Sequence, residues 1–321
     1  MLDERFPVWA PAHQRSKLAL SFFAFARRST TPQAQAPRGE PARFTSPDTH
    51  GYRAFMDFRG KWVLVTGASA GLGREFARQL AVEHGANLVI SARRLQKLQE
   101  LKAELEPKGV QVVCVTGDMS KPDDVDRVIT EAMTGRQLYG AILNAGATHF
   151  GHHHQLPWEE FLSMLQLNVT STVRLATELV SHMKAHRLGG GLMIVSSMSG
   201  VMPVPYQSAY SGTKAFLNSF GTALAHELEG HPVSLTVFAP GGIQTEMTSG
   251  EKFSTLTKWL APANVTAKAG LKAMRQRKRL AVPGFLNQLG AFTFRFVPRR
   301  FAMGQLASTY RKALLDSGVK E

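Results

Sequence analysis

Cysteine is almost absent from this chain of 321 residues. The one cysteine, Cys114, stands in the apolar run Val112–Val115 and is expected inside a buried strand. No disulfide framework can form within the chain, which fits a reducing compartment such as the cytoplasm. Long apolar runs are absent as well: no stretch of eighteen apolar residues occurs, so we expect no membrane-spanning helix.

Acidic residues are missing from one long segment. From Lys252 to Leu315 the chain has 13 basic residues and no acidic one, whereas residues 1–251 are close to neutral. The net charge of +14 is therefore concentrated towards the C-terminus. Such a local excess argues against nucleic-acid binding by the whole surface and favours a localised contact with an anionic partner.

Residues 1–55 lack a regular hydrophobic period. Pro, Ser, Thr, Gln, Ala and Arg dominate residues 27–47, and this composition favours a disordered N-terminal extension. The short apolar run Leu18–Ala26 follows two basic residues and is similar to a secretory signal or an Arg-rich transit peptide. A translation start at Met56 is a further alternative, because a compact domain would then open with no spare residues.

Residues 56–283 show short apolar runs that alternate with helical patterns. The runs are continuous, which is typical of parallel strands covered on both faces. We therefore predict an α/β fold, a single domain with a Rossmann-type doubly wound parallel sheet and helices on both faces. The expected strands are 62–65, 88–90, 110–115, 141–143, 192–195, 234–238 and an edge strand 280–282; the expected helices include 95–106, 123–133, 158–186 with a break near Asn168, and 210–229.

A glycine-rich turn separates the first strand from the first helix. Strand, turn and helix together form an anion site at a helix N-terminus, where glycine lets the backbone approach a pyrophosphate. The spacing departs from GxGxxG, but its place in the first βαβ unit predicts a dinucleotide site. The expected cofactor-binding residues of this turn are Gly67, Ser69, Gly71, Leu72 and Gly73.

Arginines follow the second strand where an NAD site usually has an acid. That Asp or Glu would hold the ribose 2′-hydroxyl. Here Arg93 and Arg94 end the strand, and no acidic residue occurs before Glu100. Because a guanidinium pairs with phosphate through a planar fork, we predict that the two arginines bind the 2′-phosphate of NADP(H). The alternative, a solvated arginine at a helix start, stays open for one of the two.

A tyrosine and a lysine stand four residues apart in the stretch 200–220. Small residues surround Tyr210 and Lys214 and a helical apolar pattern follows, so both side chains are expected on one face of a helix. A free phenol has a pKa of about 10, and a nearby ammonium lowers it. The pair is therefore suited to moving a proton to or from an alcohol or carbonyl oxygen.

Over about residues 58–245, these motifs resemble the short-chain dehydrogenase/reductase family. The family's motifs occur in its order: Thr66-Gly67-xxx-Gly71-x-Gly73, Asp118, Asn144-Ala145-Gly146, Asn168, Ser197, Tyr210-xxx-Lys214 and Pro240-Gly241. One departure is slight, since Leu143 stands where the family usually has a first Asn before Asn144. The resemblance implies an NADP(H)-preferring oxidoreductase that interconverts a carbonyl and an alcohol.

The resemblance also implies the role of each site residue. Tyr210 would be the general acid/base, and Lys214 would lower its pKa and hold the nicotinamide ribose. Ser197, 13 residues before Tyr210, would position the substrate oxygen. Asn168 would kink its helix and hold a water of the proton relay. The other implied cofactor contacts are Asp118 at the adenine, Asn144, Ala145 and Gly146 along the cofactor, Pro240 and Gly241, and Ile243 and Thr245 at the carboxamide.

Three segments are candidates for the substrate pocket: 149–154, 198–206 and 245–260. Residues 201–205 are mostly apolar, which favours a hydrophobic, lipid-like ketone or aldehyde. The triplet His152–His154 invites a metal interpretation, but adjacent residues rarely converge on one ion. We expect a polar loop at the pocket mouth and no metal.

Two other functions would use parts of the same sequence. A non-catalytic NADP(H)-binding scaffold would need no catalytic set, and a nucleic-acid binder would use the basic segment; we expect neither. Residues 284–321 predict a basic amphipathic helical extension, in which Phe285, Leu289, Phe292 and Phe296 follow a helical spacing. This stripe either docks peripherally on an anionic membrane or lids the pocket. A homo-oligomer is a further possibility.

Overall fold

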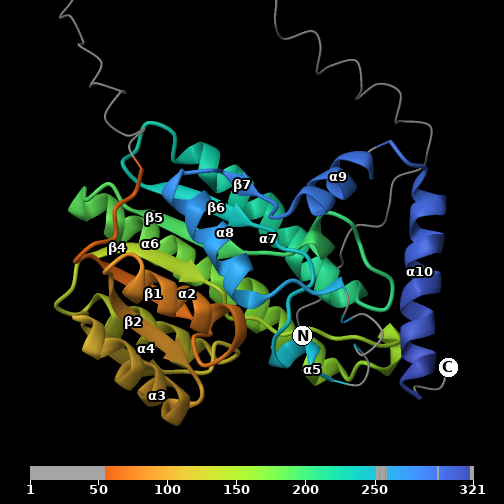
Figure 1. The fold of residues 1–321 in the computed structure, drawn as a ribbon, viewed down its shortest axis with the longest axis horizontal. Coiled ribbons are helices and arrows are strands. Elements are labelled where there is room, and N and C mark those ends of the chain that lie inside the picture. The colour runs from red at the N-terminus through yellow and green to blue at the C-terminus, as the bar shows by residue number, and fades with distance from the viewer. Residues whose placement is uncertain (1–54, 251–252, 254–256, 258, 295, 319–321) are drawn as a thin grey trace, which may run out of the picture. The chain divides into compact units, whose positions relative to one another are not determined.

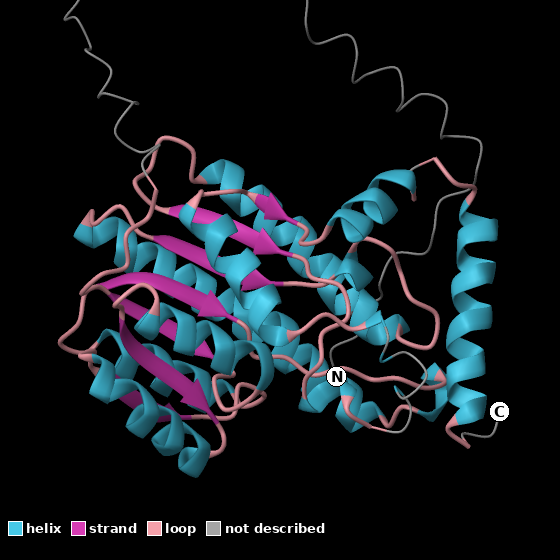
Figure 2. Ribbon diagram, viewed as in Figure 1, coloured by secondary structure: helices cyan, strands magenta, loops and turns pink. Residues whose placement is uncertain are grey.

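The computed structural model describes residues 55–250, 253, 257, 259–294 and 296–318, and the disordered extension expected before residue 55 lies outside them. Strands and helices alternate as predicted (Figures 1 and 2). The strands are β1 (Trp62–Thr66), β2 (Asn87–Ala92), β3 (Val112–Thr116), β4 (Leu138–Leu143), β5 (Gly191–Val195), β6 (Ser234–Phe238) and β7 (Leu280–Ala281). The helices are α2 (Gly71–Val82), α3 (Leu95–Leu105), α4 (Pro122–Met133), α5 (Trp158–Leu165), α6 (Ser171–His186), α7 (Ser208–Glu227), α8 (Ala263–Arg275), α9 (Phe285–Thr293) and α10 (Arg299–Asp316).

The seven strands form one parallel sheet in the order β3-β2-β1-β4-β5-β6-β7. This confirms the doubly wound Rossmann-type sheet, with β7 at its edge. The chain proceeds from β1 in one direction to β3 and then resumes on the other side at β4. In such sheets the crevice for a ligand lies at the carboxyl ends of the strands beside this reversal. The topology therefore places the site near the ends of β1 and β4.

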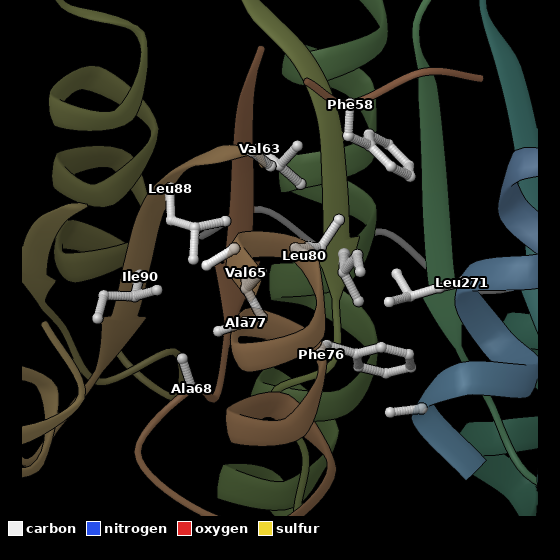
Figure 3. Close-up of a cluster of buried hydrophobic side chains, with 14 of the residues drawn as sticks. Phe58, Val63, Val65, Ala68, Phe76, Ala77, Leu80, Leu88, Ile90 and Leu271 are labelled. Carbon is white, nitrogen blue, oxygen red and sulfur yellow. The ribbon is translucent and has the colours of Figure 1, made fainter. Parts of the chain in front are cut away.

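One face of the sheet is covered by α2, α3 and α8, and Figure 3 shows the side chains packed there. The ring of Phe76 on α2 meets Phe238 of β6 edge to face at 6.3 Å. Gly270 allows α8 to approach this pair, since a Cβ at residue 270 would lie 2.9 Å from the ring of Phe76. A larger residue at this point would push α8 away from the sheet.

The other face is covered by α4, α6 and α7, which share a second apolar cluster with the sheet. The predicted long helix 158–186 is interrupted, as expected, near Asn168. A π-helical turn, Gln166–Thr170, separates α5 from α6. Such turns widen a helix locally and are frequent at functional sites. The interruption brings the buried Asn168 towards the strand ends.

Met56, the residue predicted to open the compact domain, packs against the end of α8. Met56 is fully buried, its N–H donates to the carbonyl of Arg275 at 3.0 Å, and its own carbonyl accepts from Arg275 Nε at 3.1 Å. None of the described helices combines the length and the apolar character needed to cross a membrane.

Candidate active site

A cavity of about 650 Å³ opens at the carboxyl ends of the strands. Its volume falls in the usual range for small-molecule sites. Six parallel strands end around it, so residues far apart in sequence meet there. Each strand end contributes a predicted site residue: Gly67 after β1, Arg93 after β2, Asp118 after β3, Asn144 after β4, Ser197 after β5 and Pro240 after β6.

Almost all predicted site residues line this one cavity. The lining residues among them are Gly67, Ser69, Gly71, Leu72, Arg93, Arg94, Asp118, Asn144, Ala145, Gly146, Ser197, Tyr210, Lys214, Pro240, Gly241, Ile243 and Thr245. Gly73 and Asn168 do not line it. Gly73 instead packs against Gly67, and Asn168 is hydrogen-bonded to Ala147 and Thr213.

The glycine turn packs too tightly for side chains. Gly67 and Gly71 have positive φ angles of 68° and 53°, a region that favours glycine. A Cβ on Gly73 would lie 2.3 Å from the carbonyl oxygen of Gly67, so Gly73 allows helix and turn to touch. No side chain caps α2, and its first turn contains no acidic residue. The N–H groups of this helix end therefore fit the pyrophosphate of a dinucleotide.

The two arginines after β2 differ in their contacts. Arg94 donates to Ser69 Oγ at 3.0 Å and pairs with Glu246 at 2.9 Å. Arg93 is 74% exposed, and its closest acid is Asp118 at 3.9 Å. Arg93 therefore has fewer close contacts within the protein than Arg94 and is the more available of the two to bind a ligand.

Thr66 and Asn144 tie the ends of β1 and β4 together. Thr66 Oγ1 accepts from the N–H groups of Asn144 at 3.0 Å and of Ala145 at 3.1 Å. Asn144 Nδ2 donates back to the Thr66 carbonyl at 3.1 Å. These bonds fix the two loops on either side of the crevice. Thr66 was not among the predicted site residues, although it stands directly before Gly67.

Tyr210 and Lys214 lie together on α7, as the spacing predicted. Lys214 is 4% exposed, and its Nζ lies 5.7 Å from the centre of the Tyr210 ring. The ammonium donates to the carbonyl of Val195, at the end of β5, at 2.9 Å. Burial lowers the pKa of Lys214 to about 8. This lysine is therefore partly neutral in mildly alkaline solution.

The pKa of Tyr210 corrects one expectation. The sequence predicted that Lys214 lowers this pKa, whereas in the structure burial raises it and a hydrogen bond with Ser197 opposes the rise. The physical reason is desolvation, because burial disfavours the charged phenolate. Tyr210 is thus protonated at neutral pH and suited to act first as an acid.

Asn168 is buried, and both the oxygen and the nitrogen of its side-chain amide form hydrogen bonds. Its Oδ1 accepts from the N–H of Ala147 at 2.8 Å, and its Nδ2 donates to the Ala147 carbonyl at 2.9 Å and to Thr213 Oγ1 at 3.0 Å. A Cβ on Gly146 would lie 3.2 Å from Asn168 Oδ1 and 3.6 Å from Lys214 Nζ. Glycine at this position keeps the space between amide and ammonium open. The relay water of Asn168 stays a prediction.

The substrate end of the cavity differs from the prediction. Of the predicted segment 198–206, Ser199 lines the cavity, but residues 201–205 do not. Val204 is buried and its N–H donates to Ser211 Oγ at 3.1 Å, because the chain turns back over α7. Residues 149–154 also stay behind the wall. The segment 245–260 does contribute, as expected. The apolar lining consists of Leu167, Met247, Phe253, Trp259, Leu260 and, from α10, Tyr310.

The histidine triplet makes aromatic contacts. The ring of His152 meets Tyr206 at 5.2 Å, and that of His153 meets Phe161 at 6.4 Å. In the described part of the chain, no group of three or more His, Cys, Asp or Glu side chains is arranged to hold a metal ion.

The comparisons agree with this fold. Residues 61–254 match the family described as short chain dehydrogenase, and the chain belongs to this family of oxidoreductases. It is 36% identical over 183 residues to a very-long-chain 3-oxoacyl-CoA reductase of Pyricularia oryzae, covering 55% of this chain and 54% of that protein. The chain thus spans about half the length of this relative.

Two further proteins extend the comparison. The chain is 32% identical over 208 residues to the 17-beta-hydroxysteroid dehydrogenase type 3 of Rattus norvegicus, covering 64% of this chain and 67% of that protein. A short-chain dehydrogenase from Sphingobium yanoikuyae, solved in complex with NADPH, is 25% identical with a TM-score of 0.67, covering 76% of this chain and 95% of that one. The family predicted from the motifs is confirmed.

Proposed function

We propose that this protein is an NADP(H)-dependent oxidoreductase that interconverts a carbonyl and an alcohol on a hydrophobic, lipid-like substrate. The observation that carries the proposal is the convergence of Ser197, Tyr210 and Lys214 in a cavity with an anion-binding turn and an apolar wall. The names of the relatives support the substrate class, since 3-oxoacyl chains and steroids are both hydrophobic carbonyl compounds.

The chain's residues fit a bound NADP(H). The N-terminus of α2 would hold the pyrophosphate, Arg93 the 2′-phosphate and Lys214 the nicotinamide ribose. The bound cofactor would supply a hydride to the carbonyl carbon. The exposed Arg93 supports the choice of NADP(H), because the end of β2 offers no acid for a 2′-hydroxyl.

Proton transfer falls to Tyr210. Ser197, hydrogen-bonded to Tyr210, would hold the substrate oxygen beside the phenol. Tyr210 then donates its proton to this oxygen while negative charge develops there. The raised pKa of Tyr210 suits the direction of reduction, since the acid must begin protonated.

The direct test is a substrate screen. The oxidation of NADPH and of NADH is followed by absorbance with a panel of aliphatic, aromatic and steroid ketones. We expect turnover with NADPH that increases with the hydrophobicity of the ketone. A non-catalytic scaffold would bind NADPH without turnover on any ketone, which would overturn the proposal.

The pH dependence of cofactor use provides a second test. Lys214 is charged below its pKa of about 8 and neutral above it. We therefore expect kcat/KM for NADPH to fall as the pH rises past about 8, because this parameter reports the free enzyme. Lys214→Arg stays charged, so its profile should lose this descending limb. A wild-type profile that is flat to pH 9.5 would contradict the role of the ammonium.

We also propose that α9 docks on a membrane surface, as one interpretation of its sequence suggested. Helix α9 contacts the domain through the polar side chain of Asn287: a Cβ on Gly241 would lie 2.9 Å from Asn287 Nδ2. The apolar side chains are exposed instead, with Phe285 at 75% and Leu286 at 76%. None of the residues of α9 lines the cavity, so this stripe does not form the alternative lid.

The nearby charges favour an anionic surface. Arg295, Arg299 and Arg300 follow α9 in the sequence, and each basic residue adds about 1 kcal/mol near an anionic leaflet. The other basic cluster, at the end of α8, has partners inside the domain. Arg277 donates to the carbonyl of Gly190 at 3.1 Å, and Arg279 pairs with Glu229. The membrane contact is therefore assigned to α9 and the arginines after it.

Co-sedimentation with vesicles of phosphatidylserine and phosphatidylcholine tests this contact. We expect binding at low salt that weakens at high salt and is lost in the double variant Phe285→Ser/Leu286→Ser. Val82→Ser, which removes an exposed apolar residue on α2, should bind like the wild type. Absence of binding at low salt would refute the proposal. A dimer that the double variant converts to monomer would also refute it, since α9 would then cover a second copy.

A further inference from the structure

Helix α10 reaches the active-site cavity from the C-terminal end of the chain. Thr309 and Tyr310 line the same cavity as Tyr210. The helix stands at the right-hand edge of Figure 1. In the sequence it follows residues 61–254, the segment that matches the family. This part of the wall therefore lies outside the segment that carries the family's motifs.

Aromatic and aliphatic contacts anchor α10. Ala313 and Leu314 are each 2% exposed and share a small apolar cluster with Phe150. The ring of Phe150 meets Tyr310 edge to face at 5.5 Å and Phe253 at 5.0 Å. Phe150 thus holds two residues of the cavity wall, Tyr310 and Phe253, in fixed positions.

A polar contact ties α10 to the loop before the catalytic helix. Arg311 Nε donates to Tyr206 Oη at 2.9 Å. Tyr206 has a φ of 64°, which is rare for a bulky residue, and it precedes Tyr210 by four positions. Its carbonyl accepts from the N–H of Gly151 at 2.9 Å. Strained residues of this kind persist where the surroundings fix them, as α10 and this loop do here.

The hydroxyl of Tyr310 is a donor with no described partner. No hydrogen bond joins it to another residue that the structure describes, although its ring is half-buried. Burial raises the pKa of Tyr310, so the hydroxyl keeps its proton. The two phenols are also close enough that a charge on Tyr310 would raise the pKa of Tyr210. A second hydrogen-bond donor therefore lines the same cavity as Tyr210.

We propose that Tyr310 is a substrate-specificity residue. Its hydroxyl donates a hydrogen bond to a second oxygen of the substrate, near the carbonyl that Tyr210 protonates, and its ring completes the apolar wall. The substrates selected in this way are hydrophobic ketones with a neighbouring acceptor, such as β-keto esters or diketones. This inference depends on the proposed oxidoreductase function.

A pair of substrates separates the roles of hydroxyl and ring. The assay measures kcat and KM with NADPH for a medium-chain β-keto ester and for a simple ketone of the same chain length. Tyr310→Phe should lose about 10-fold in kcat/KM on the keto ester, the value of one hydrogen bond to a buried site, and less than about twofold on the simple ketone. Tyr310→Ala should lose on both. Ser308→Ala, an exposed change on the same helix, should match the wild type.

The controls distinguish this inference from the function on which it rests. The Kd for NADPH, measured by fluorescence, should be the same in wild type and Tyr310→Phe. A wild-type protein that reduces both compounds, with Tyr310→Phe affecting both equally or neither, overturns the role of Tyr310 alone. A wild-type protein that binds NADPH but reduces no ketone overturns the proposed function, and this inference with it.

Discussion

Tyr210→Phe should lower kcat for ketone reduction by at least about 100-fold, since a positioned general acid usually contributes this much or more. Phenylalanine keeps the ring that lies 5.7 Å from Lys214 Nζ and removes only the hydroxyl that bonds Ser197. The Kd for NADPH should therefore change by less than about twofold, because the contacts of Arg93 and of the glycine turn are untouched. Steady-state kinetics and a fluorescence titration measure the two effects.

The matched control is Tyr139→Phe. Tyr139 is 7% exposed and packs against Phe58 at the opposite end of the sheet, so its loss tests the cost of removing a buried phenol elsewhere. This variant should keep wild-type kcat. A Tyr210→Phe variant that retains more than about a tenth of wild-type kcat would rule out Tyr210 as the acid.

The sheet could be predicted because its signals are local. Each continuous apolar run became a parallel strand, and most of these strands end beside a polar or glycine residue. The edge strand β7 is only two residues long, yet Leu280 and Ala281 pair with β6 as expected. The break near Asn168 was also predicted, because the resemblance to the family implies that Asn168 kinks its helix, and this residue lies in the π-helical turn Gln166–Thr170. What the sequence could not provide is the close approach of α8, which depends on Gly270 meeting Phe76.

The cofactor end of the site could be predicted because parallel strands bring their following residues to one edge. Gly67, Asp118 and Asn144 need only be placed after the right strands to meet in the crevice. The substrate end depends on tertiary contacts instead. The apolar residues 201–205 looked like a pocket wall, but the turn after β5 directs them onto α7. Tyr310 enters the cavity from α10, a segment with no motif.

The pKa values of Tyr210 and Lys214 were the properties of the site that could least be predicted without the structure. Spacing alone placed Lys214 beside Tyr210, and an ammonium at that distance should favour the phenolate. Burial of both groups reverses the result, because desolvation raises the pKa of the phenol and lowers that of the lysine. The depth of a side chain below the surface follows from packing and cannot be inferred from a four-residue interval.

Arg93→Glu should shift the ratio of kcat/KM for NADPH to that for NADH by about 100-fold towards NADH. The lost hydrogen bond between guanidinium and 2′-phosphate is worth about 1.5–3 kcal/mol, or roughly 10- to 100-fold, and the new carboxylate repels the phosphate as well. With NADH the same carboxylate can accept from the 2′-hydroxyl. Arg93 is exposed, and its closest acidic partner, Asp118, lies 3.9 Å away. The substitution therefore breaks no closer ion pair.

Two further variants decide whether the shift belongs to Arg93 itself. Lys97→Glu makes the same change of charge on α3 outside the cavity and should leave the ratio within about twofold, because exposed charges at that distance are screened. Arg94→Glu breaks the contacts with Ser69 and Glu246 and should weaken both cofactors together. The NADP(H) assignment fails if the ratio stays the same in both arginine variants, since no other basic residue directly follows β2 to bind the 2′-phosphate.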